Sequence, residues 1–83
     1  MKRVALVQVK LKPGVLDAEG KTVEKALDLL GLEVDKVSFI KTYRIEITRE
    51  TEAEIQAAAE AACQKLLANP VVHEYSITLE EAD

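Results

Sequence analysis

The sequence predicts a two-layer α+β fold, and three observations support that prediction. Apolar residues alternate with period two over residues 3–11, 34–48 and 71–79, which is typical of half-buried strands. Apolar residues recur every three to four positions over residues 18–30 and 52–68, which is typical of amphipathic helices. Capping and breaking residues separate these stretches, so each of them is expected to form its own element.

The first predicted strand, residues 3–11, carries different side chains on its two faces. One face holds Val4 and Leu6 at its start and the polar residues Gln8 and Lys10 at its end. A two-layer domain of this size has helices for only one side of its sheet. We therefore expect Val4 and Leu6 to take part in self-association.

A stiff loop follows this strand. Proline fixes its own φ and pushes the preceding residue towards extended geometry, while glycine permits positive φ. The loop carries no catalytic pair of side chains and is our candidate for contact with another protein. It consists of Lys12, Pro13, Gly14, Val15, Leu16 and Asp17.

The first predicted helix begins after Asp17, whose carboxylate can accept from amides two or three residues on. Gly31 stands where a left-handed residue would end the helix. Gly20 is either a weak point in the first turn or a place where the helix approaches another backbone closely. The predicted apolar face consists of Val23, Ala26, Leu27 and Leu30.

The middle stretch changes phase. Val37 and Phe39 share one face, whereas the run that follows alternates in a different register. A tight hairpin at residues 40–42 is the preferred interpretation, and one bent ribbon with a bulge is the alternative. From the second run we expect further self-association contacts, by Tyr43, Ile45 and Ile47.

The second predicted helix starts with a capping box, Thr51 with Glu54, and ends at Asn69-Pro70. Cys63 flanks its apolar stripe and is interpreted as a small buried hydrophobic residue. His73, at the start of the last strand, is interpreted as a surface residue.

The predicted order is therefore βαββαβ, the ferredoxin-like order, in an antiparallel sheet with two helices on one face. We expect residues 1–83 to form a single domain.

Composition excludes several classes of function. The chain has a net charge of -4 and three aromatic residues (two Tyr, one Phe), which is poor material for binding nucleic acid. It has one Cys, one His and no membrane-length apolar stretch. We expect a cytoplasmic protein without catalytic residues, metal or cofactor of its own, and without nucleic-acid or membrane partners.

Three segments are informative when taken together: residues 9–17 (Val-Lys-Leu-Lys-Pro-Gly-Val-Leu-Asp), 37–43 (Val-Ser-Phe-Ile-Lys-Thr-Tyr) and 66–71 (Leu-Leu-Ala-Asn-Pro-Val). In these segments the chain resembles the PurS family, small subunits of phosphoribosylformylglycinamidine (FGAM) synthase. The resemblance implies a non-catalytic subunit of an ATP-dependent glutamine amidotransferase complex in purine biosynthesis. It further implies a dimer or tetramer that binds a large synthetase subunit (PurL-like), which uses ATP and Mg, and a glutaminase subunit (PurQ-like).

A second function stays open at this point. A stand-alone regulatory dimer of the same fold could use the loop at residues 12–17 with the first helix to hold a small ligand at its dimer interface. A glycine-bearing loop near a helix start is compatible with both functions.

Overall fold

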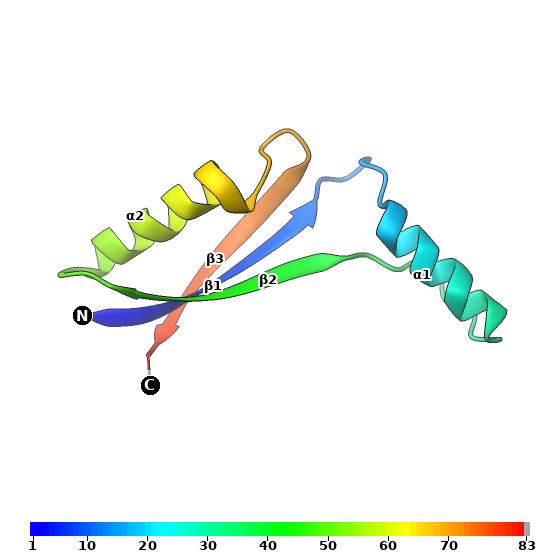
Figure 1. Cartoon of the computed structure of the whole chain (residues 1–83), viewed down its shortest axis with the longest axis horizontal. Helices are drawn as coiled ribbons and strands as arrows, with labels where there is room; N and C mark the ends of the chain where they lie inside the picture. The colour runs from blue at the N-terminus through cyan, green and yellow to red at the C-terminus, as the bar shows by residue number, and fades with distance from the viewer. Residues whose placement is uncertain (83) are drawn as a thin grey trace.

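Three antiparallel strands form one sheet in the order β2-β1-β3 in this computed structural model, which describes residues 1–82. The central strand β1 (Lys2–Leu11) lies between β2 (Ile40–Thr48) and β3 (His73–Glu81) (Figure 1). Val7 lies opposite Tyr43 on one side and Ile77 on the other. Because the three residues share a face, the period-two pattern of all three strands builds one continuous apolar surface.

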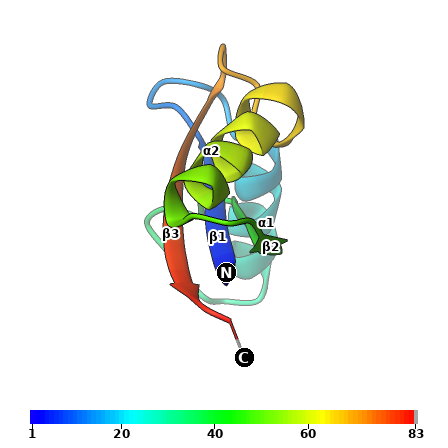
Figure 2. The same cartoon turned by 90° about the vertical axis from the view of Figure 1, so that its left-hand side faces the viewer.

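Helix α2 (Glu52–Ala62) covers that surface (Figure 2). It begins as predicted: the Thr51 hydroxyl accepts a hydrogen bond from the Glu54 amide at 3.2 Å. It continues into a π-helical turn, Cys63–Leu67. The small residues of α2 bring the helix close to the sheet. The buried core between them forms two clusters, one of Ala5, Ile47, Ile55 and Ala59 and the other of Val7, Val9, Cys63 and Ala68.

Helix α1 (Ala18–Leu29) also has the predicted ends. The Asp17 carboxylate accepts from the Gly20 amide, and Gly31 adopts a φ of 80° beyond the last turn. The fold class is thus confirmed: an α+β chain with an antiparallel sheet and two helices. Neither helix in the described part of the chain is long and apolar enough to cross a membrane.

The prediction that both helices lie on one face of the sheet is wrong. Only α2 packs there, and α1 projects beyond the end of the sheet (Figure 1). The connecting loop explains the difference. The Lys12 amide donates to the Val72 carbonyl at 2.8 Å, so the chain continues past the sheet instead of turning back over it.

The predicted hairpin at residues 40–42 is also wrong. β2 is continuous, and its pairing with β1 runs without a bulge from Thr48 opposite Lys2 to Ile40 opposite Lys10. The change of phase before residue 40 has another cause. The amides of Val37 and Phe39 donate to carboxylates of α1 and its cap, so this segment belongs to α1 and not to the sheet.

The chain is elongated. Its principal extents are 52 × 30 × 15 Å and its radius of gyration is 16.3 Å, whereas a compact chain of this length has a radius of about 12 Å. We refer to residues 12–39 as the α1 arm, because they form the part that projects from the sheet.

Candidate interaction site

The base of the α1 arm is fixed by one carboxylate. Asp17 accepts from the Gly20 amide through Oδ1 at 2.8 Å and from the Phe39 amide through Oδ2 at 3.0 Å. These two backbone donors, that of Gly20 first, lower the pKa of Asp17 below its ordinary value. The residue predicted as a helix cap therefore also joins the start of the arm to its end.

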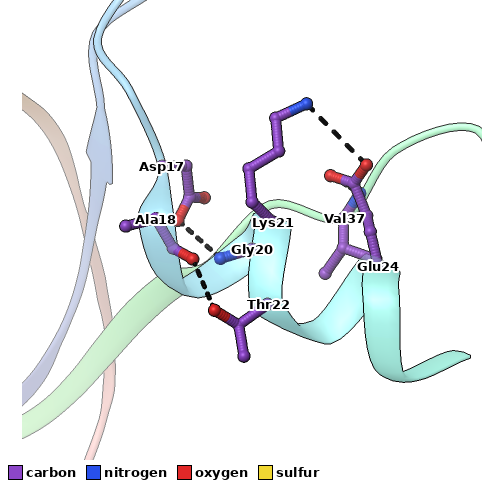
Figure 3. Close-up of polar contacts among 7 residues, drawn as sticks. All are labelled: Asp17, Ala18, Gly20, Lys21, Thr22, Glu24 and Val37. Atoms are coloured by element: carbon purple, nitrogen blue, oxygen red, sulfur yellow. Dashed lines mark hydrogen bonds and ion pairs between the residues drawn. The ribbon is translucent and has the colours of Figure 1, made fainter.

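A second carboxylate holds the helix to the returning chain. Glu24 accepts from the Val37 amide at 3.2 Å, and its other oxygen lies 3.9 Å from the Lys21 ammonium (Figure 3). Gly20 is buried where α1 meets the returning chain. A Cβ on Gly20 would overlap the Val37 carbonyl oxygen. The close-approach interpretation of Gly20 is thus confirmed, and α1 with residues 37–39 forms one braced unit.

The loop at residues 12–17 is attached to the loop that precedes β3. Besides its backbone bond to Val72, Lys12 donates from Nζ to the Pro70 carbonyl at 2.6 Å. Gly14 adopts a φ of 85°, as the turn requires. The two loops therefore lie side by side, with Leu16 (75% exposed) and Val71 (78% exposed) open to contact.

A cleft of about 670 Å³ lies between this loop, α1 and residues 36–40. Two of its four lysines are in ion pairs: Lys10 lies 3.4 Å from Glu74, and Lys21 lies 3.9 Å from Glu24. Four lysines and three carboxylates line the cleft, and this near balance of charge makes it a poor binding site for a polyanion. Exposed aliphatic groups beside paired charges are instead typical of protein contacts.

The residues predicted for self-association lie on both faces of the sheet. Val4 and Leu6 are on the face opposite α2, while Tyr43, Ile45 and Ile47 point toward α2. Val4 and Ile47 are buried within the single chain, whereas the other three remain partly accessible. The face opposite α2 is otherwise largely polar, with Lys2 and Arg44 both paired to Glu46.

Several polar contacts escaped the sequence analysis. The Tyr75 hydroxyl donates to Glu60 at 2.7 Å, and this bond, followed by burial, raises the pKa of Tyr75. His73 accepts at Nδ1 from the Asn69 amide and so closes the loop before β3. The first contact joins β3 to α2, whose relative position no local pattern encodes, whereas the second spans four residues within one loop.

The single thiol is unsuited to nucleophilic chemistry. Cys63 is fully buried as predicted, and burial, followed by the nearby Glu60 charge, raises the pKa of its thiol. A thiol held in its protonated form is a poor nucleophile.

Comparison with known proteins identifies the family of this chain. The family model described as PurS, phosphoribosylformylglycinamidine (FGAM) synthase, matches residues 4–81. The PurS subunit of Archaeoglobus fulgidus is 46% identical over 79 residues, which cover 94% of this chain and 99% of the relative.

Solved structures match over the same range. The crystal structure of Methanocaldococcus jannaschii PurS, a subunit of formylglycinamide ribonucleotide amidotransferase in purine biosynthesis, is 43% identical with a TM-score of 0.84, covering 98% of this chain and 99% of that one. A chain in the structure of PurLQS from Thermotoga maritima is 30% identical with a TM-score of 0.85, covering 95% and 98%. The chain therefore belongs to the PurS family, the small subunits of FGAM synthase.

Proposed function

We propose that this chain is the non-catalytic assembly subunit of FGAM synthase, joining a PurL-like synthetase subunit to a PurQ-like glutaminase subunit. The complex would pass ammonia from glutamine to formylglycinamide ribonucleotide with hydrolysis of ATP in the cytoplasm. ATP and Mg would be used by the synthetase subunit and not by this chain. The observation that carries the proposal is the whole-length similarity to a chain of the Thermotoga maritima PurLQS structure.

The arrangement of the chain supports an assembly role. A braced arm and two joined loops present exposed aliphatic side chains at one end of the sheet. Such a surface can orient a partner without touching the substrate. In the proposed complex, self-associated copies act as a rigid wedge that holds the glutaminase against the synthetase, so that ammonia is not released to solvent.

The loop at residues 12–17 is the proposed contact with another subunit. Leu16 is its most suitable anchor, because it is exposed and lies on a loop that Lys12 fixes at its base. The proposed self-association gives a dimer or tetramer, and it would use the accessible members of the predicted set, namely Leu6, Tyr43 and Ile45. The similarity to subunits of one synthase favours this function over the stand-alone ligand sensor.

Reconstitution tests the proposal. Glutamine-dependent and ammonia-dependent synthetase activities are measured with the synthetase and glutaminase subunits, with and without this chain. We expect glutamine-dependent turnover only when the chain is present, and similar ammonia-dependent turnover in both cases. Equal glutamine-dependent turnover without the chain would contradict the assembly role.

A matched pair of variants tests the loop. Leu16→Asp should remove most of the glutamine-dependent activity, because a charge at the anchor opposes its desolvation. Leu29→Asp introduces the same charge at another exposed leucine, on α1, and should leave activity unchanged. Equal activity of the two variants would argue against loop contact.

A further inference from the structure

The loop that precedes β3 is organised around Asn69. The Asn69 carbonyl accepts from the amides of Val72 at 3.1 Å and His73 at 2.7 Å, and the Asn69 Oδ1 accepts from the Val71 amide at 3.0 Å. The Asn69 amide in turn donates to Nδ1 of His73 at 2.9 Å. These four hydrogen bonds close the segment at residues 69–73, and of the four only the last has a titratable side chain as its acceptor.

This last bond requires a neutral imidazole. A neutral imidazole has one N–H and one unprotonated nitrogen, whereas an imidazolium has an N–H on both nitrogens and accepts nothing. Because Nδ1 of His73 accepts from the Asn69 amide, the proton of the neutral ring lies on Nε2. Protonation would place a second N–H directly opposite the amide N–H, so the bond would be lost.

The segment that His73 closes also fixes the loop at residues 12–17. The Lys12 amide donates to the Val72 carbonyl at 2.8 Å, and Lys12 Nζ donates to the Pro70 carbonyl at 2.6 Å. Both acceptors lie between Asn69 and His73. The position of the 12–17 loop, which carries the exposed Leu16, therefore depends on the conformation of residues 69–73.

The imidazole is accessible to protons and is surrounded by charges of both signs. His73 is only partly buried. Together with Leu67 of the π-helical turn it lines a cavity of about 310 Å³, whose charged groups are Lys10 from β1, Lys41 from β2, and Asp17 and Glu19 at the start of α1. On its own strand the next residue, Glu74, pairs with Lys10. Two lysines and two carboxylates balance one another in the cavity, so the bond to the Asn69 amide distinguishes the neutral from the protonated ring.

We propose that His73 is a positioning residue for the subunit contact, and that its protonation releases the segment at residues 69–73 and weakens binding of the partner subunits. The neutral ring keeps the carbonyls of Pro70 and Val72 in place for Lys12, and a loop held in its binding conformation binds more tightly than a free one. The inference rests on the proposed function, because it needs the 12–17 loop to contact another subunit.

Two substitutions separate the acceptor from its titration. His73→Asn places Oδ1 as many bonds from Cα as Nδ1 was, so it keeps an acceptor that does not titrate, whereas His73→Leu has no acceptor. Affinity for the synthetase and glutaminase subunits is measured by fluorescence anisotropy of the labelled chain. At about pH 7.5, where histidine is ordinarily neutral, we expect equal dissociation constants for the unmodified chain and His73→Asn. That of His73→Leu should be roughly 3–10-fold higher.

The comparison is then repeated at about pH 5.5, where histidine ordinarily carries its proton. The unmodified chain should now bind as weakly as His73→Leu, while His73→Asn keeps its advantage. Because the partner subunits are the same for all three chains, their own response to pH cancels in the ratios. An unmodified chain that matches His73→Asn at both pH values would overturn the proposal.

Nuclear magnetic resonance of the isolated chain tests the bond without any partner. Long-range proton–nitrogen spectra of the imidazole should show an unprotonated Nδ1 at about pH 7.5, and a ring with its proton on Nδ1 would overturn the proposal. If the expected ring form is found but no chain binds the partners, the assembly role fails and the positioning role falls with it. If binding is normal but independent of His73, only this inference fails.

Discussion

At the scale of single residues, Asp17 connects the most distant parts of the arm. Its carboxylate accepts hydrogen bonds from the amide of Gly20, in the helix that it caps, and from the amide of Phe39, 22 positions further along the chain. A cap usually acts within one turn, and here the same group also fixes the return of the chain to β2. Its removal should therefore affect more than the helix end.

The first prediction concerns Asp17→Ala. The substitution removes both acceptors, and we expect the melting temperature to fall by roughly 4–8 °C. Asp28→Ala, at an exposed position on the same helix, is the control and should change the melting temperature little. Equal melting temperatures for unmodified chain and Asp17→Ala, measured by circular dichroism, would contradict the double role.

The lowered pKa of Asp17 gives a second prediction. A carboxylate whose pKa is depressed on folding stabilises the protein above its unfolded pKa, about 3.9, and loses this effect as the pH falls through the folded value. The difference in melting temperature between unmodified chain and Asp17→Asn should therefore be full at pH 6 and shrink below about pH 4. A difference that stays constant down to pH 2.5 would exclude linkage to Asp17.

Tyr75 gives the opposite dependence on pH. Its hydroxyl donates to Glu60, and its pKa is raised. The stabilisation is complete below the unfolded pKa, about 10, and is lost as the pH rises through the folded value. Urea unfolding should find Tyr75→Phe less stable than the unmodified chain at pH 7, with a gap that narrows above about pH 10. A gap that stays constant above about pH 10 would exclude linkage to Tyr75.

At the scale of elements, α1 and its returning segment act as one piece. Gly20 permits the contact, because the Val37 carbonyl occupies the place of a side chain. The carboxylates of Glu24 and Asp17 accept hydrogen bonds from the amides of Val37 and Phe39. These amides are therefore not available for hydrogen bonds to a neighbouring strand. Residues 34–39 for this reason do not join the sheet.

Gly20→Ala should therefore destabilise the chain. In an ordinary helix interior this substitution stabilises by about 1 kcal/mol. Here the overlap with the Val37 carbonyl should reverse the sign and destabilise by about 1–3 kcal/mol. Lys25→Ala, at an exposed position on the same helix, should change the free energy of unfolding in urea by less than about 0.5 kcal/mol. An increase in stability for Gly20→Ala would refute the close approach.

At the scale of the whole molecule, the core joins only α2 to the sheet, and the arm adds exposed surface. A chain with so small a core gains stability when a second copy covers that surface, and the gain depends on concentration. We expect the melting temperature to rise between about 1 and 100 μM protein in the unmodified chain and in Leu29→Asp. In Leu6→Asp, which places a charge at an accessible position of the predicted self-association set, the rise should be much smaller.

Elements whose signals are local can be predicted from the amino-acid sequence alone. Asp17 and Thr51 fixed the helix starts, because a capping side chain reaches amides within its own first turn. The alternation of apolar and polar residues predicted strand β1 and which side chains of β2 share its apolar face, because side-chain direction repeats every two residues.

The position of α1 and the exclusion of residues 34–39 from the sheet follow instead from tertiary contacts. Both depend on bonds between distant positions, from Lys12 to Pro70 and Val72 and from Asp17 to Phe39. Local patterns specify which side chains a helix needs to bury, but not which chain supplies the surface. An amphipathic stripe is satisfied equally well by its own sheet or by a partner's.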